Sequence, residues 1–142
     1  MTFNKKKIIF ICKNNSGRSQ MAESIFKQAY GEYYEVYSAG SDPKEINPLT
    51  IKVLEEIGID TSLNRSKSLK EFQEYEFDYV VSLCGDEEGS CPTFLKGKKH
   101  IYHGFNDPKS FGGDKKAKLK LFRAIRDEIN DWIRNSLVDE IK

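Results

Sequence analysis

The residues with the clearest chemical potential form one short segment near the N-terminus. Cys12 and Arg18 are separated by five small or polar residues, and the apolar run 8–11 directly precedes them. A cysteine thiolate is a strong nucleophile, and a guanidinium group offers a planar fork of N–H donors that matches two oxygens of a tetrahedral anion. The pair therefore predicts a site where Cys12 attacks an oxyanion that Arg18 holds.

The segment that joins the two residues has the composition of an anion-binding loop. The N–H groups of a loop that leads into a helix can point at an anion, and the helix dipole adds positive potential, which favours the thiolate form of Cys12. Glycine and asparagine in this loop tolerate left-handed backbone angles, and Ser19 either caps the helix or donates a hydrogen bond to the Cys12 sulfur. The predicted oxyanion-binding residues are Lys13, Asn14, Asn15, Ser16, Gly17, Arg18 and Ser19. The alternative is an inert buried cysteine beside a surface arginine.

Two further cysteines, Cys84 and Cys91, lie seven residues apart. The segment 85–90 between them is polar, acidic and bounded by glycines, which predicts a mobile connection. Considered separately, Cys84 is best interpreted as a small core residue and Cys91 as a loop thiol without a function. A zinc site with His100 and His103 is a further alternative, but the spacing matches no standard zinc pattern.

The elements that must position these residues follow from the apolar pattern. Strands are expected at Lys6–Ile11, Tyr34–Gly40, Asp78–Leu83 and Lys99–Tyr102, and helices from Arg18 to Gly31, Asn47 to Gly58 and Asp114 onward. This alternation predicts an α/β fold, a three-layer domain with a central four-stranded parallel sheet flanked by helices. The polar segments 12–18, 84–97 and 103–113 each follow a strand, so they can converge at the carboxyl edge of the sheet.

Length and charge limit the classes of function. The 142 residues suit a single domain spanning 1–142, and a net charge of +1 gives no global field toward nucleic acid or a membrane. The run 8–12 is too short to span a membrane and has no signal-peptide cleavage site, which favours a cytoplasmic protein. The odd cysteine count does not suit a disulfide framework.

The sequence resembles the thioredoxin-linked arsenate reductases, which share a fold with low-molecular-weight tyrosine phosphatases. The resemblance covers nearly the whole chain, in the segments Ile9–Cys12, Arg18–Glu23, Tyr37–Gly40, Asn47-Pro48, Val80–Cys84, Cys91-Pro92 and Gly104–Pro108. There are two departures. Lys13-Asn14 and Gly17 stand where the family commonly has Thr-Gly and a further cysteine outside the redox trio.

The resemblance implies a sequence of sulfur reactions. Cys12 forms an adduct with arsenate, and Cys84 then attacks the Cys12 sulfur, which releases arsenite and leaves a Cys12–Cys84 disulfide. Cys91 next attacks Cys84, and thioredoxin reduces the resulting Cys84–Cys91 disulfide. Because a disulfide requires Cα atoms within about 7 Å, the segment that carries these cysteines must move. Phosphate and sulfate are expected as look-alike ligands, with no bound cofactor.

Asp107 is the general acid that the resemblance implies. A departing oxygen of arsenate needs a proton, which a carboxyl group above the anion can supply. Propensity alone would instead make Asp107-Pro108 a turn with an exposed carboxylate. Asn106 stands where relatives often have a second Asp, so Asp107 is the only candidate in this loop.

Reductases of this family can hold a monovalent cation behind the loop. Asn15, Glu23 and Ser38 match three of its ligands, but Lys67 replaces the fourth, a carboxylate. A Lys67 ammonium paired with Glu23 would take the place of the cation, and a solvated Lys67 is the alternative. No metal site is expected.

The leading expectation is a thioredoxin-dependent arsenate reductase. Its main rival is a tyrosine phosphatase that uses only Cys12, Arg18 and Asp107. Phosphatases of this fold usually have tyrosines after Asp-Pro, whereas Lys109-Ser110-Phe111 follows here. A non-enzymatic oxyanion or redox sensor is a third alternative, which the intact nucleophile and acid disfavour.

Overall fold

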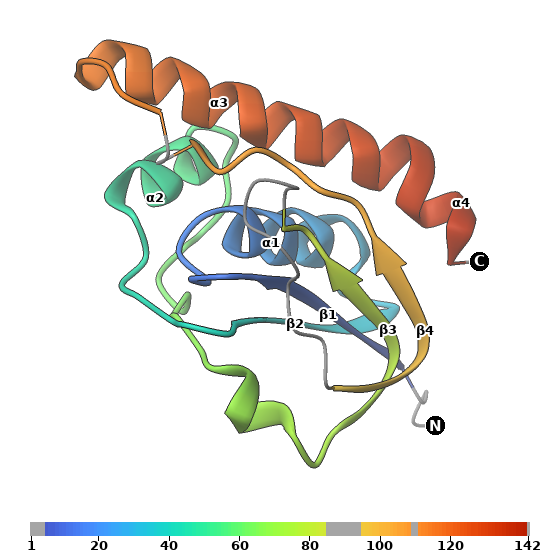
Figure 1. Cartoon of the computed structure of the whole chain (residues 1–142). Coiled ribbons are helices and arrows are strands. Elements are labelled where there is room, and N and C mark those ends of the chain that lie inside the picture. The colour runs from blue at the N-terminus through green and yellow to red at the C-terminus, as the bar shows by residue number, and fades with distance from the viewer. Residues whose placement is uncertain (1–4, 85–94, 109–110, 142) are drawn as a thin grey trace.

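Four parallel strands form the central sheet of the computed structural model, in the order β2-β1-β3-β4 (Figure 1). The structure describes residues 5–84, 95–108 and 111–141. The strands are β1 (Lys6–Cys12), β2 (Tyr34–Gly40), β3 (Glu76–Ser82) and β4 (Lys96–Tyr102). The predicted four-stranded parallel sheet is confirmed.

As the sequence predicted, helices connect β1 to β2 and β2 to β3, and a long helix follows β4. They are α1 (Arg18–Tyr30), α2 (Pro48–Glu55) and α3 (Lys115–Trp132), with a 3-10 helix η1 (Leu69–Phe72), a π-helical segment η4 (Ile133–Leu137) and a short α4 (Val138–Glu140). The side chains of Asn47 and Asp114 accept N–H groups at the starts of α2 and α3, at 2.9 Å in both cases. Within the described ranges, no helix combines the length and apolarity needed to cross a membrane.

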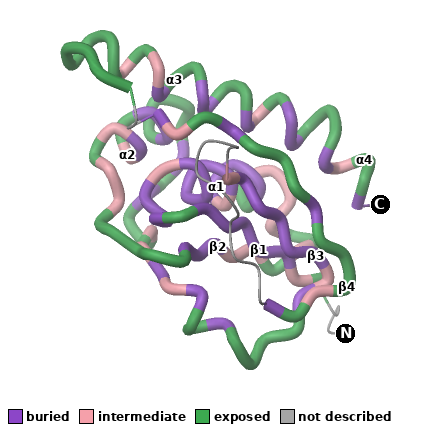
Figure 2. Tube along the Cα trace, viewed as in Figure 1, coloured by how far each residue is buried: buried purple, intermediate pink, exposed green. Residues whose placement is uncertain are grey.

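The two faces of the sheet are covered unequally. Ile8 and Phe10 of β1 pack into the larger core beneath α1, α2 and α3, whereas Ile9 and Ile11 point to the opposite face and pack with η1. This alternation is the period-2 geometry of a strand. Figure 2 shows β1 and α1 buried along most of their length, while α3 is buried on one side only. The central strand is therefore the best shielded element, and it ends at Cys12.

Several elements differ from the sequence prediction, among them β3, which begins at Glu76 and not at Asp78. β4 begins at Lys96, three residues earlier than expected, because it pairs with β3 from Glu76 onward. Gly97 in this stretch lies so close to Val80 that a Cβ atom would approach the valine Cγ2 to 2.5 Å. Glycine and lysine have low strand propensity, so sheet pairing decides this boundary. The 3-10 helix η1 was not predicted, and the C-terminal helix is interrupted by η4 rather than continuous.

A cluster of charged side chains joins α2 to α3. Glu56 accepts hydrogen bonds from Arg123 Nη2 at 2.6 Å and from Arg123 Nε at 2.9 Å. It also accepts one from Arg126 Nη1 at 3.0 Å. The hydrogen bonds from Arg123, with those from Arg126, lower the pKa of Glu56 from 4.5 to about 2. Arg126 also donates to the carbonyl of Val53, so its guanidinium group connects the two helices through backbone and side chain.

This cluster predicts a pH dependence of stability. The folded-state pKa of Glu56 lies below its ordinary value, so its contribution is complete above pH 4.5 and is lost as the pH falls toward 2. Glu56→Gln should lower the melting temperature at pH 6, and the difference from wild type should shrink at pH 3. The matched control is Glu55→Gln at the last residue of α2, whose carboxylate accepts from the Thr61 hydroxyl and forms no ion pair with an arginine among the described residues. A constant Glu56→Gln difference at both pH values would contradict the assignment.

Candidate active site

The predicted nucleophile and the predicted anion-binding arginine stand at the two ends of one loop. Cys12 is the last residue of β1, and Arg18 is the first residue of α1. Both are buried, with exposed fractions of 2% and 3%. Gly17 is the N-cap of α1, and no side chain caps this helix. The first N–H groups of α1 therefore keep the positive end of the helix dipole directed into the loop.

Neighbouring segments hold the loop by donating hydrogen bonds to its backbone carbonyl groups. The oxygen of Lys13 accepts from the Asp42 N–H at 2.8 Å, and that of Asn14 accepts from the Lys44 N–H at 3.0 Å. Ser16 is held in the same way, by the Asn47 N–H at 3.1 Å and the Thr50 hydroxyl at 2.9 Å. In a peptide unit the C=O and N–H groups point in opposite directions. Because these carbonyl groups point out of the loop toward their donors, the N–H groups of the same peptide units point into the loop, where they can bind an anion.

Gly40, at the end of β2, allows the loop to approach the sheet closely. A Cβ atom at this position would lie 2.6 Å from the Lys13 oxygen and 2.8 Å from the Asn15 nitrogen. Only Asn15 in the loop has a left-handed conformation, with φ 49°, whereas Gly17 has φ −139°. The expectation of left-handed angles therefore applies to Asn15 and is wrong for Asn14 and Gly17.

The side chain of Asn15 is oriented without ambiguity. Its Oδ1 accepts from Gln20 Nε2 at 2.9 Å and from the backbone N–H of Lys67 at 2.8 Å. A backbone N–H is always a donor, so this contact fixes which end of the amide is the oxygen. The two hydrogens of Nδ2 then point to the hydroxyls of Ser19, at 2.7 Å, and Ser38, at 3.0 Å.

This orientation determines the role of the Ser19 hydroxyl. Ser19 Oγ lies 2.9 Å from Cys12 Sγ, a contact in which either atom can donate. Because Ser19 already accepts a hydrogen from Asn15, its own hydrogen is available for the sulfur. Ser19 is thus positioned to stabilise a Cys12 thiolate, and of the two roles expected for it the capping role is wrong.

A buried ion pair lies behind Asn15. Ser38 donates to Glu23 Oε1 at 2.6 Å, and Lys67 Nζ contacts the same oxygen at 3.1 Å. The side chains of Lys67 and Glu23 are only 10% and 15% exposed. Lys67 is therefore not a solvated surface lysine, and its ammonium group lies among the side chains expected to bind a cation.

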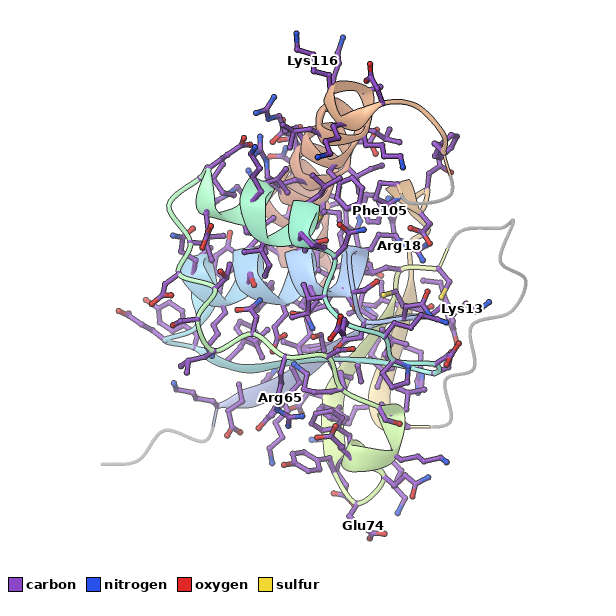
Figure 3. All side chains as sticks on the ribbon, turned by 90° about the vertical axis from the view of Figure 1, so that its left-hand side faces the viewer. Lys13, Arg18, Arg65, Glu74, Phe105 and Lys116 are labelled. Atoms are coloured by element: carbon purple, nitrogen blue, oxygen red, sulfur yellow. The ribbon has the colours of Figure 1, made fainter. Side chains whose placement is uncertain are left out.

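Arg18 connects the loop to the two other segments at this edge of the sheet. Its Nη1 donates to the carbonyl of Phe105 at 3.0 Å and lies 3.5 Å from that of Leu83, and its Nη2 is 3.7 Å from Asp107 Oδ2. Figure 3 shows Arg18 beside Phe105. An oxyanion held by the guanidinium group would come within reach of the Asp107 carboxyl group.

Cys84 follows the strand next to the nucleophile. The N–H of Leu83 donates to the carbonyl of Ile11 at 2.8 Å, so the chain reaches Cys84 directly beside the end of β1. Cys84 is partly buried and disulfide-bonded, whereas Cys12 is a free thiol. The two sulfurs are thus not joined to each other. Cys91 lies outside the described residues.

Sequence reasoning missed two residues that shape the loop. Gln20 donates to Asn15 and to the carbonyl of Arg65 at 2.8 Å, and Thr50 holds the Ser16 carbonyl. Both side chains are fully buried. Their position beside apolar helix residues was the available signal, since buried polar groups normally have a bonding role. Among the residues that the structure describes, no group of three His, Cys, Asp or Glu side chains could hold a metal ion.

Both a family model and related proteins match nearly the whole length of the chain. The family model described as low molecular weight phosphotyrosine protein phosphatase matches residues 7–142. The arsenate reductase of Halalkalibacterium halodurans is 40% identical over 131 residues, which cover 92% of this chain and 94% of that protein.

Solved structures agree with the sequence comparison. An arsenate reductase in the phosphate binding state superposes with a TM-score of 0.79 and 31% identity, covering 96% of this chain and 99% of the other. The thioredoxin-dependent arsenate reductase of Corynebacterium glutamicum has a TM-score of 0.70 and 32% identity, covering 99% of this chain and 64% of the other.

The direction of the Ser19 hydrogen bond predicts the reactivity of Cys12. In a Cys84→Ser, Cys91→Ser background, where Cys12 is the remaining thiol, Ser19→Ala should slow alkylation by iodoacetamide at pH 7 roughly three- to tenfold. The reason is that a hydrogen bond to a charged group contributes about 1.5 kcal/mol, partly offset by the greater nucleophilicity of a more basic thiolate. Ser24→Ala is the control, a buried serine of α1 that bonds Asn64 instead. Equal alkylation rates in all three proteins would show that Ser19 does not stabilise the thiolate.

Proposed function

The chain belongs to the low molecular weight phosphotyrosine protein phosphatase family, and within this family we propose that it reduces arsenate to arsenite with electrons from a thioredoxin. The observation that carries the proposal is the arrival of Cys84 beside the end of β1, where Cys12 lies. Hydrolysis uses one nucleophilic thiol. A second thiol at this position supplies a route for electrons, and it is consistent with relatives that are named arsenate reductases.

The first step is a substitution at arsenic. The loop N–H groups and Arg18 hold the oxyanion, and the Cys12 thiolate attacks arsenic(V) to form an S–As bond. Asp107 gives a proton to the departing oxygen, which leaves as water. The Asp107 carboxyl group lies 3.7 Å from Arg18, so one short segment brings the acid to the anion. No electrons have yet been transferred to arsenic.

The second step is the reduction. The Cys84 thiolate attacks Cys12 Sγ, the S–As bond breaks, and its electron pair stays with arsenic, which leaves as arsenite. The two sulfurs lose two electrons in total and become a disulfide. In the third step Cys91 attacks Cys84, which frees Cys12 as a thiolate, and a thioredoxin dithiol then reduces the Cys84–Cys91 disulfide. A free Cys12 beside an oxidised Cys84 is the combination of sulfur states expected before that last reduction.

Phosphatase activity is the second candidate, and the loop itself favours it as much as the first. Cys12, Arg18 and Asp107 suffice for attack on a phosphate ester and for protonation of the leaving group. The segment 108–113 directly after Asp107 has one aromatic residue, Phe111, where an aryl-phosphate pocket would need more. This rival leaves Cys84 without a role, so we rank it second.

Lys67 has a supporting role in the proposal. Its ammonium group pairs with Glu23, which accepts from Ser38, which in turn accepts from Asn15. We propose that this internal cation holds Asn15 in place and makes a bound monovalent ion unnecessary. A largely buried Glu23 without a positive partner would be costly, because its carboxylate has lost most of its hydration.

The internal ammonium predicts how activity responds to salts. The wild-type KM for arsenate should be the same in potassium chloride and in tetramethylammonium chloride at equal ionic strength. Lys67→Met should raise this KM several-fold, and Lys67→Asp, which restores a carboxylate, should make it depend on potassium. Lys70→Met, an exposed lysine of η1, serves as the control. Strong activation of the wild type by potassium would contradict the proposal that Lys67 replaces a bound monovalent cation.

Cysteine variants test the reaction sequence. With thioredoxin, its reductase and NADPH, we expect arsenate-dependent NADPH oxidation in the wild type and its loss in Cys12→Ser, Cys84→Ser and Cys91→Ser. Reduced Cys91→Ser should still release one arsenite per enzyme and stop at the Cys12–Cys84 disulfide. Hydrolysis of an aryl phosphate by Cys84→Ser provides the folding control, because that reaction needs only the first step. An inactive wild type, or full turnover by Cys84→Ser, would refute the proposed function.

A further inference from the structure

A pocket of about 380 Å³ lies beside the proposed redox centre and has no part in the chemistry described so far. It opens between the segment that follows β4 and one side of α3, and its lining residues are His103, Gly104, Phe105, Asn106, Glu128, Asp131 and Trp132. Figure 1 shows α3 running alongside this segment. The segment also carries Asp107, so the pocket lies next to the active site but on the outer side of its wall.

The floor of the pocket is aromatic. The rings of His103 and Trp132 are stacked, with centroids 4.7 Å apart and an interplanar angle of 19°, and Phe105 meets Trp132 edge-on at 5.7 Å. His103 is exposed, so the outer face of this stack is open to a partner. A π face of this kind attracts cations, especially where the approach excludes water.

Polar groups around this floor are left without partners. Glu128 and Asp131 form no ion pair with any residue that the structure describes, although neighbouring Asp127 is paired with Arg126 at 2.9 Å. The indole N–H of Trp132 likewise makes no hydrogen bond within the described part of the chain. Because no buried side-chain nitrogen of the described residues lacks a partner, this N–H is in contact with solvent and can donate to a carbonyl group that enters the pocket.

The position of the pocket connects it to Cys84. The N–H of His103 donates to the carbonyl of Ser82 at 2.9 Å, and the N–H of Phe105 donates to that of Leu83 at 3.1 Å. The pocket wall is therefore hydrogen-bonded to the two residues that precede Cys84. A protein whose thiol attacks a disulfide at Cys84 must cover the surface around this residue, and the pocket lies on that surface.

We propose that this pocket is the docking site for the electron donor, and that it binds a basic side chain next to the donor's redox cysteines. The Lys or Arg group lies against the His103 face between Glu128 and Asp131, while a backbone carbonyl of the same segment accepts from the Trp132 indole. The inference rests on the proposed thioredoxin-coupled function and deepens it. The negative charge and the aromatic floor select a cationic peptide, and they repel the oxyanion that the neighbouring loop attracts.

Charge reversal in the pocket separates docking from chemistry. With a bacterial thioredoxin, its reductase and NADPH, Glu128→Lys/Asp131→Lys should raise the KM for thioredoxin about tenfold, because a like charge opposes the basic partner. Trp132→Phe, which keeps a ring but removes the N–H donor, should raise it a few-fold. The KM for arsenate and the rate of arsenate reduction with dithiothreitol should stay at wild-type values, since a small reductant does not need the pocket.

Two further variants make the result decisive. Glu32→Lys/Glu74→Lys changes the net charge equally on surfaces away from the pocket, and Figure 3 shows Glu74 at the lower end of the molecule, well away from Phe105. The Glu32→Lys/Glu74→Lys control should keep the wild-type KM for thioredoxin. If the charge-reversed protein does not fold, the isosteric Glu128→Gln/Asp131→Asn protein must show a raised KM instead. An unchanged KM for thioredoxin in the folded pocket variants overturns the docking proposal, whereas a wild type that cannot reduce arsenate with dithiothreitol overturns the proposed function itself.

Discussion

The orientation of one amide side chain controls the active loop. Asn15 combines a left-handed backbone with an Oδ1 that accepts from Gln20 and from the backbone of Lys67. With the oxygen fixed in this way, both hydrogens of Nδ2 are directed at hydroxyl groups, one of which belongs to Ser19. The Ser19 hydrogen is then directed at Cys12. A side chain buried among donors and acceptors thus transmits its orientation to the sulfur through hydrogen bonds that each permit one direction.

The order of the strands supplies the second requirement, which is the proximity of three separate chain segments. β1 lies between β2 and β3, so the loop after β1 is flanked by Gly40 on one side and by the approach to Cys84 on the other. Parallel strands place all of their carboxyl ends at one edge, and Arg18 spans that edge through the carbonyl groups of Leu83 and Phe105. The arginine therefore stabilises the site mechanically before any anion is bound, and it couples the anion loop to the segment that carries Cys84.

Much of this arrangement could be predicted from the sequence, because it depends on local patterns. The apolar run before Cys12 and the polar loop after it indicated the strand, the loop and the helix, and the parallel sheet followed from alternation. The contacts that orient Asn15 were not visible. They join residues such as Gln20 and Arg65, which are far apart in sequence, and no local pattern encodes them. The early start of β4 at Lys96 was missed for the same reason, since pairing with β3 overrides the low strand propensity of that segment.

In the proposed reaction, a loop suited to phosphate chemistry serves a reduction. Binding at the loop cannot distinguish arsenate from phosphate well, because both are tetrahedral oxyanions and the donors are N–H groups and one guanidinium fork. Selection has to occur after the attack by Cys12. Water that reaches the adduct at its central atom gives hydrolysis, whereas a thiolate that reaches the sulfur gives reduction, and arsenic(V) accepts an electron pair far more readily than phosphorus(V). In the proposed reaction, a second thiol beside the end of β1 would therefore make the chain selective for arsenate at the electron-transfer step, while leaving phosphate as a reversible ligand of the same loop.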